Sequence, residues 1–141
     1  MNVSNDTNFD IKAIAQNCGL FGGMDDNLVI SNIDNLKTLY QSSQLVEIYN
    51  YMLSVATEPD VIMHIIRNLD VYRDPSSLEY LVDVLLLKNA NCSDSETKEK
   101  YNNVRVMCAK AIANQKNTDV VSSLLYCMNN KNENYRVRLA C

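Results

Sequence analysis

Apolar residues recur along this chain at the spacing of a helix face. Ile33, Leu36 and Tyr40 are separated by three and four positions, which places them on one side of a helix. The same spacing returns in later segments that polar residues or proline separate: Leu45-Ile48-Tyr49-Met52, Val61-Ile65-Ile66-Leu69, Leu78-Leu81-Val82-Leu85, Val104-Cys108-Ala111-Ile112 and Val120-Leu124-Leu125-Met128. The pattern predicts a succession of amphipathic helices.

Capping residues predict where several of these helices begin or end. Asn8 is placed to cap a first short helix, and Gly19 fits the left-handed position after its end. Asp60 and Asn103 are expected to cap later helices. Asp74, which precedes a proline, is expected to be the cap before a proline at the first helical position.

The chain divides into a short polar start and one domain. Residues 1–7 are polar and predicted to be disordered, and residues 8–141 are predicted to form a single helical domain. Within it, residues 89–101 are polar throughout, so we interpret them as an inserted loop with at most a short exposed turn. The last helix is expected to be cut off after about two turns.

A short motif repeats near the end of the chain. Val104-Arg105-Val106-Met107-Cys108 returns 33 residues later as Val137-Arg138-Leu139-Ala140-Cys141. Val61 and Val104 stand 43 residues apart, and the difference of ten is about the length of the polar insertion. The same step of 43 pairs Leu78 with Val121, Leu81 with Leu124, and Leu85 with Met128. A period of this size is typical of helical repeats.

At these residues the chain resembles the HEAT repeat family, in particular its short-unit, phycobilisome-lyase-type branch. Asn103-Val104-Arg105, and Asn134 with Val137-Arg138, match the opening of that family's second helix, most clearly over residues 75–141. The first copy departs from the pattern because Ile62 stands in place of the arginine, and Asn129 or Asn130 stands where the family has aspartate. The resemblance implies an all-α fold, an α-solenoid of antiparallel helix pairs (a HEAT/armadillo-like superhelix).

The resemblance also implies a role for the repeated arginine. In the family, the arginine of Val-Arg satisfies carbonyls of a turn or carboxylates of the next unit. We therefore assign Arg105 and Arg138 a structural role first and ligand binding second.

Composition and charge narrow the class of protein. The chain has three glycines and two prolines, fewer than a turn-rich β-sandwich or barrel requires. Its formal net charge of −4 makes nucleic acid an unlikely partner, because phosphate binding requires a basic stripe. No run approaches the roughly 20 apolar residues of a membrane helix, and the N-terminus lacks the basic start of a signal peptide. We expect a soluble, cytoplasmic protein with no membrane partner.

The residues that carry chemistry are scattered. Five cysteines lie far apart without a CxxC pair, so we expect reduced structural thiols, with Cys92 in a polar loop the most open to modification. The single histidine, His64, has no ligand-spaced partner, and Gly22-Gly23 is interpreted as a turn. No catalytic, cofactor-binding or metal-binding residues are predicted, and we do not expect an enzyme.

The leading functional hypothesis is a protein-protein interaction scaffold or adaptor that binds a protein or peptide on the concave face of the stack. The candidate interaction surface consists of Arg105, Lys110, Arg136 and Arg138, together with Tyr126, since exposed tyrosine is favoured at interfaces. We also expect the short last helix to expose Val137 and Cys141, which predicts a homodimer through the C-terminal repeat or a chain cut from a longer protein.

Two alternatives come from other classes. The first is a lyase-type or other enzyme-associated HEAT-like protein that acts on a chromophore protein, which requires a reactive cysteine or an acidic pocket. The second is an acidic immunity-type protein that neutralises a partner toxin by masking a basic surface.

Overall fold

A computed structural model describes residues 9–87 and 94–141, and within these ranges the chain forms eight α-helices and no strand. This confirms the prediction of an all-α chain. The expected disorder of residues 1–7 lies outside the described residues. The α-helices are α2 (Ile11–Cys18), α3 (Asp26–Asn35), α4 (Ser42–Val55), α5 (Pro59–Tyr72), α6 (Leu78–Leu87), α7 (Ser95–Asn114), α8 (Val121–Asn129) and α9 (Tyr135–Ala140).

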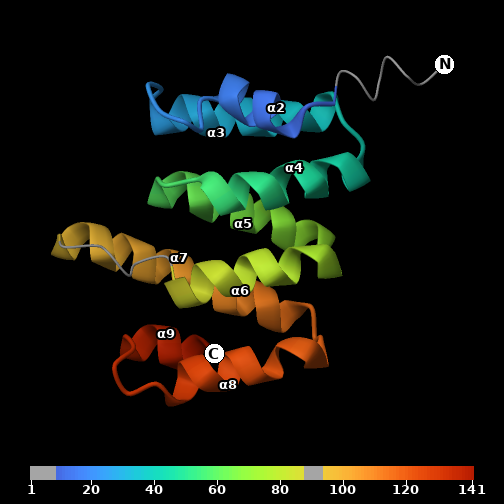
Figure 1. The fold of residues 1–141 in the computed structure, drawn as a ribbon. Coiled ribbons are helices and arrows are strands. Elements are labelled where there is room, and N and C mark those ends of the chain that lie inside the picture. The colour runs from blue at the N-terminus through green and yellow to red at the C-terminus, as the bar shows by residue number, and fades with distance from the viewer. Residues whose placement is uncertain (1–8, 88–93) are drawn as a thin grey trace.

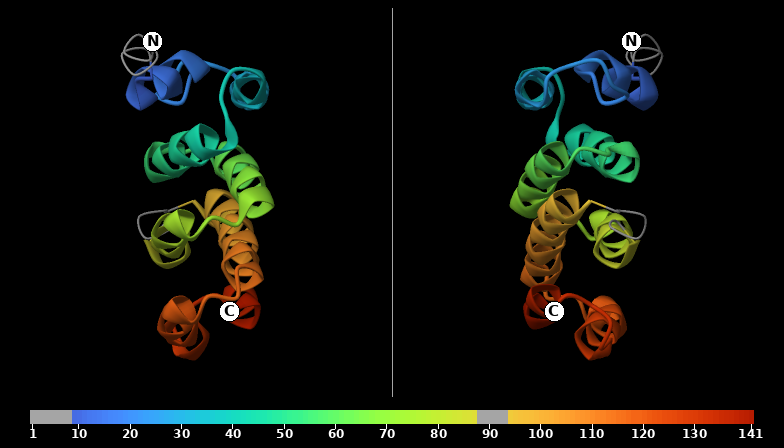
Figure 2. Two further views of the ribbon diagram at one scale, coloured as in Figure 1. Left: turned by 90° about the vertical axis from the view of Figure 1, so that its right-hand side faces the viewer. Right: turned by 90° about the vertical axis from the view of Figure 1, so that its left-hand side faces the viewer.

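The helices lie in two layers that follow the order of the chain (Figures 1 and 2). One layer holds α2, α4, α6 and α8, and the other holds α3, α5, α7 and α9. Within the second layer, α5 packs against α3 and α7, and α7 packs against α9. Across the layers, α4 packs on α5, α6 on α7, and α8 on α9. The N-terminal helices therefore form one end of the stack, and α8 with α9 forms the other.

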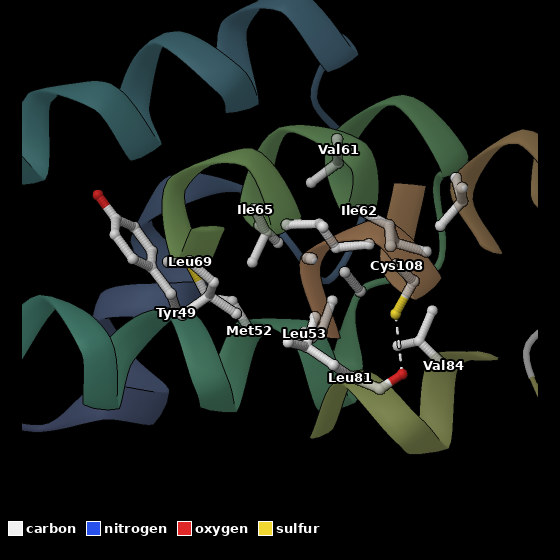
Figure 3. Packing of buried hydrophobic residues seen from close by; sticks show 14 of the residues in the cluster. Tyr49, Met52, Leu53, Val61, Ile62, Ile65, Leu69, Leu81, Val84 and Cys108 are labelled. Atoms are coloured by element: carbon white, nitrogen blue, oxygen red, sulfur yellow. Dashed lines mark hydrogen bonds between the residues drawn. The ribbon is translucent and has the colours of Figure 1, made fainter. Parts of the chain in front are cut away.

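The centre of the core lies between α4, α5, α6 and α7 (Figure 3). Their facing stripes are buried almost completely, as the sequence pattern predicts: Tyr49, Met52, Ile62, Ile65, Ile66, Leu69, Leu81 and Leu85. Leu53, which no predicted stripe included, is buried with them. The thiol of Cys108 also faces this region and donates a hydrogen bond to the carbonyl oxygen of Leu81 at 2.8 Å. No helix in the described part of the chain is long and apolar enough to cross a membrane.

A one-turn 3₁₀ helix precedes both α6 and α8. These turns are η2 (Pro75–Ser77) and η3 (Thr118–Val120). Asp74 caps the first by accepting from the backbone N–H of Ser76, and Asn117, 43 residues later, caps the second by accepting from the N–H of Asp119. The two capped turns are therefore separated by the same 43 residues that separate equivalent apolar positions in the sequence. The predicted role of Asp74 is confirmed.

The predicted caps at Asn8 and Asp60 are wrong. Asp10, not Asn8, caps α2 by accepting from the backbone N–H of Ala13; Asn8 itself lies outside the described residues. Helix α5 begins at Pro59, so Asp60 lies inside its first turn. Proline favours the first helical position because its missing N–H needs no partner there. Gly19 does adopt the predicted left-handed conformation, with a φ of 95°.

The polar insertion is only partly a loop. Helix α7 begins at Ser95, where Asp94 caps it by accepting hydrogen bonds from the backbone and side chain of Thr97. Asn103 therefore lies within the helix and does not cap it, which corrects the prediction. Residues 95–101 are helical although they are polar, because a capped helix can extend into solvent without an apolar face. The remainder of the insertion, residues 89–93, lies outside the described residues.

Candidate interaction surface

Arg105 is buried within the stack. Its Nε donates to the carbonyl oxygen of Leu85 at 2.6 Å, and its Nη1 donates to Oε1 of Glu133 at 2.8 Å. Its Nη2 pairs with Oε2 of the same carboxylate. The guanidinium thus joins the end of α6 to the linker that precedes α9. The structure removes Arg105 from the candidate surface and gives it the structural role expected of the Val-Arg arginine.

The contacts with Arg105 lower the pKa of the Glu133 carboxyl. Burial by itself raises its pKa, but hydrogen bonds from Arg105 and from the backbone N–H of Asn134, together with the charge of Arg105, outweigh burial. The pKa of Glu133 therefore lies below its ordinary value. The sequence pattern did not predict this partner, because Glu133 stands in an asparagine-rich linker where nothing marks it as buried.

Arg138 makes the bond that Arg105 makes, one repeat later. Its Nε donates to the carbonyl oxygen of Met128 at 2.8 Å. Met128 follows Leu85 by 43 residues, and Arg138 follows Arg105 by 33, so both offsets seen in the sequence return in one repeated contact. In each copy the arginine satisfies a carbonyl near the end of the preceding helix, where backbone acceptors lack helical partners.

Arg136 also makes contacts within the molecule. Its Nη1 donates to Oδ1 of Asn103 at 2.9 Å, and its Nη2 pairs with the carboxylate of Glu99. Both partners are on α7, so Arg136 fastens the start of α9 to that helix. Its side chain remains 37% exposed, which leaves part of it at the surface.

Lys110 and Tyr126 are the two predicted residues that are exposed. Lys110 lies on α7 and forms no ion pair with any residue that the structure describes. Tyr126 is 65% exposed on α8, where with Ser122, Leu125, Asn129 and Asn130 it lines a shallow hollow of about 290 Å³. Lys110 does not line that hollow, so the five predicted residues do not form one site.

The expected exposure of Val137 is wrong. Val137 is fully buried, because α9 packs against both α7 and α8 and turns this side chain toward them. Cys141 is half-buried against the same apolar cluster. The side chains that α9 does expose are Tyr135 and Leu139, on its opposite side.

An apolar stripe on α8 is exposed at the C-terminal end of the molecule. Val121, Leu125 and Met128 follow one another at spacings of four and three, and each is at least 39% exposed. Only Cys127 is buried within α8. The sequence pattern placed these residues on the apolar side of a helix, but an amphipathic pattern does not show whether a neighbouring helix covers that side.

A groove of about 290 Å³ adjoins this stripe. It lies between the C-terminal end of α7, the turn η3 and α8, and its lining is mainly apolar: Ile112, Ala113, Lys116, Asn117, Thr118, Val120, Val121 and Leu124. Helix α9 has six residues and α7 has 20. In the register of 33, Val137 and Cys141 correspond to Val104 and Cys108, so the last turns of α7 extend beyond α9. Lys116 is the only charged residue in the lining.

Several ionisable groups of the described residues make contacts within the molecule or are buried. Within the described residues, no three histidine, cysteine or acidic side chains lie where they could share a metal ion. His64 lies 2.7 Å from Oδ1 of Asp34 and joins α5 to α3. Burial raises the pKa of the Cys18, Cys108 and Cys141 thiols, which keeps them neutral and weakly nucleophilic. Cys92, a residue singled out in the sequence, lies outside the described residues.

Two further hollows are lined differently. One of about 570 Å³ is polar and includes Lys98, Glu99, Asn102 and Arg105. The other, of about 280 Å³, lies between the glycine-containing loop after α2 and the turn between α4 and α5. In the polar hollow, Arg105 and Glu99 already bind Glu133 and Arg136, so these charged groups are committed within the chain.

Comparison of this chain with protein-family models, with curated proteins and with solved structures found no match.

Proposed function

We propose that this chain is a helical-repeat binding module, an α-solenoid of antiparallel helix pairs similar to HEAT repeats, that binds a helix of another protein at its C-terminal end. Two pairs of equivalent contacts support the assignment of a helical repeat. Asp74 and Asn117 cap equivalent turns, and Arg105 and Arg138 bond to equivalent carbonyls. One helix pair cannot bury its own apolar face, so pairs of this kind stack on their neighbours.

The observation that carries the binding proposal is the groove beside α8. It lies beside the interface that α9 makes with α7 and α8, at the C-terminal end of α7. A helix seated there would cover Ala113 of α7 and Val121 and Leu124 of α8. Burying exposed apolar area of this kind contributes roughly 25 cal/mol per Å² before the costs of association.

The repeat also indicates the chemistry of the bound helix. In α7, the positions after Cys108 are Ala109, Ala111 and Ile112, all buried. A helix with two small residues and one aliphatic residue at this spacing suits a groove with this mainly apolar lining. Lys116 at the rim favours acidic side chains on the flank of that helix.

The test uses a synthetic amphipathic helix that carries alanine, alanine and isoleucine at the spacing of Ala109, Ala111 and Ile112, with glutamates on its flank. We expect saturable binding to the full chain by fluorescence anisotropy. Ala113→Trp fills the groove from an exposed position and should weaken binding at least about tenfold. Ser122→Trp, exposed on the other side of α8, is the matched control and should bind like the unmodified chain.

Three outcomes contradict the proposal. The peptide could fail to bind, or a version with aspartate in place of isoleucine could bind equally well. Light scattering could instead reveal a dimer that Ala113→Trp dissociates, in which case a second copy of this chain occupies the groove and not a helix of another protein.

A further inference from the structure

A hollow of about 280 Å³ lies toward the N-terminal end of the stack. The loop after α2, residues 19–24, and the turn between α4 and α5, residues 55–58, form its walls and lie on the same side of the molecule (Figure 1). The groove beside α8 lies at the other end of the stack, so an inference drawn from this hollow is independent of the proposed function.

Most of the side chains that line the hollow are apolar. Leu20, Val29 and Val61 are buried, whereas Phe21 and Met24 are 50% and 40% exposed. Exposed apolar side chains that gather beside a hollow are typical of binding sites, because an apolar side chain of a partner gains contact area there.

The loop that forms one wall is held in place. Gly19 takes the left-handed conformation that ends α2. Asn32 of α3 donates from its Nδ2 to the carbonyl oxygen of Cys18 at 3.2 Å and to Sδ of Met24 at 3.6 Å. A wall that is already ordered lowers the entropy cost of binding.

Two carboxylates line the hollow without a partner inside the chain. Asp26 is the first residue of α3 and is half-buried, and Glu58 directly precedes α5 and is exposed. The Glu58 side chain makes no capping hydrogen bond, and neither carboxylate forms an ion pair with a residue that the structure describes. Asp25 differs, because its side chain caps α3.

The charge of the hollow selects a cation. No lysine, arginine or histidine is among the described residues that line it. The N-terminal ends of α3 and α5 stabilise negative charge at Asp26 and Glu58, so an entering cation would meet two ionised groups and displace no internal partner. The volume is slightly below the range of roughly 300–1,000 Å³ for sites that enclose drug-sized ligands, and it suits one or two side chains of a peptide.

We propose that this hollow is an interaction site for a peptide segment of another protein that carries an arginine next to an aliphatic residue. The guanidinium pairs with Asp26 and Glu58 and stacks on the exposed ring of Phe21, and the aliphatic side chain packs on Met24. Arginine suits the site better than lysine, because its planar group bonds to carboxylates, stacks on aromatic rings and is more weakly hydrated.

The experiment titrates the isotope-labelled full chain with a short peptide that carries adjacent arginine and leucine between glycine and serine residues, and follows the backbone amides by NMR. We expect saturable shifts of the amides of Phe21, Gly22 and Gly23, and weaker binding as the salt concentration rises. In the double variant Asp26→Asn and Glu58→Gln, the dissociation constant should rise at least about tenfold.

Asp60→Asn is the matched control. Asp60 is also an exposed acid near the start of α5, but it does not line the hollow, so this variant should bind like the unmodified chain. Ala113→Trp, which fills the groove beside α8, should also leave this binding unchanged, so the present proposal and the proposed function can fail separately. Circular dichroism establishes that each variant is folded.

A second measurement requires no variant of the chain. A peptide with citrulline, the neutral analogue, in place of arginine should bind at least about tenfold more weakly. Equal binding of the two peptides, an equal loss in Asp60→Asn, or shifts confined to other parts of the chain would each overturn the proposal. A dimer in sedimentation that Asp26→Asn dissociates would assign the hollow to a second copy of this chain and would overturn it as well.

Discussion

At the scale of single residues, Arg105 shows how a buried charge is accommodated. Its guanidinium is enclosed, but a carbonyl of α6 and the carboxylate of Glu133 satisfy its donors. A buried ion pair adds little net stability over apolar residues of the same size, whereas removal of one member leaves the other unpaired.

Arg105→Ala should therefore lower the free energy of unfolding by about 3–5 kcal/mol, because Glu133 and the Leu85 carbonyl lose their partner. Chemical denaturation measures the change. Arg67→Ala on the exposed side of α5 is the matched control, with an expected change within about 0.5 kcal/mol. If the two substitutions lowered the free energy of unfolding equally, the buried ion pair would contribute no more to stability than an exposed residue.

Glu133 makes stability depend on pH. Its pKa is lower in the folded chain than in the unfolded chain, so it contributes stability above the unfolded value of about 4.3. That contribution is lost as the pH falls through the folded pKa. Urea unfolding from neutral to acidic pH should show this loss, and Glu133→Gln should flatten it. The exposed Glu47→Gln should leave the slope unchanged.

At the scale of elements, the end of α2 depends on a conformation that only glycine adopts easily. Gly19 has a φ of 95°, and a Cβ there would collide with the side chain of Met24. Gly22 also has a positive φ, but a Cβ there would meet open space.

Both Gly19→Ala and Gly22→Ala should therefore destabilise the chain, with backbone strain of about 1–2 kcal/mol each. Gly19→Ala should cost more because of Met24, and thermal unfolding measures the difference. Met24→Ala should narrow the gap between the two variants. If Gly22→Ala lowers the thermal stability more than Gly19→Ala, contact with Met24 is not what restricts the residue at position 19.

At the scale of the whole molecule, burial is greatest in the middle of the stack and smallest at its C-terminal end. Helices α4 and α5 bury seven and six residues, whereas α8 and α9 each bury one. In a stack where each pair contacts mainly its neighbours, local opening begins where the fewest contacts must be broken.

Native-state hydrogen exchange should therefore show a gradient. Amides of α8 and α9 should exchange by local opening, while those of α4 and α5 should exchange only with global unfolding. Addition of denaturant separates the two classes, because global opening exposes more surface. Uniform protection along the chain would contradict the gradient.

Much of the fold could be predicted from local pattern. The apolar periods, the capped proline at Asp74 and the glycine after α2 indicated helices and their ends, because each depends on neighbours a few positions away. The start of α7 was missed because a cap such as Asp94 extends a helix through polar residues that carry no period. Of the candidate surface, Lys110 and Tyr126 are exposed. Arg105 and Arg138 make carbonyl contacts of the kind that the resemblance implied, whereas the contacts of Arg136 with Asn103 and Glu99 were not predicted.

The sequence by itself therefore determined the all-helical class, the repeated Val-Arg segment and the offsets of 33 and 43 residues. Only the tertiary structure decided which side chains are paired, buried or exposed. It enclosed Arg105 with Glu133, buried Val137 and left the stripe on α8 uncovered. The physical reason is that helix formation depends on residues three or four positions apart, whereas burial and pairing depend on neighbours that only packing brings together.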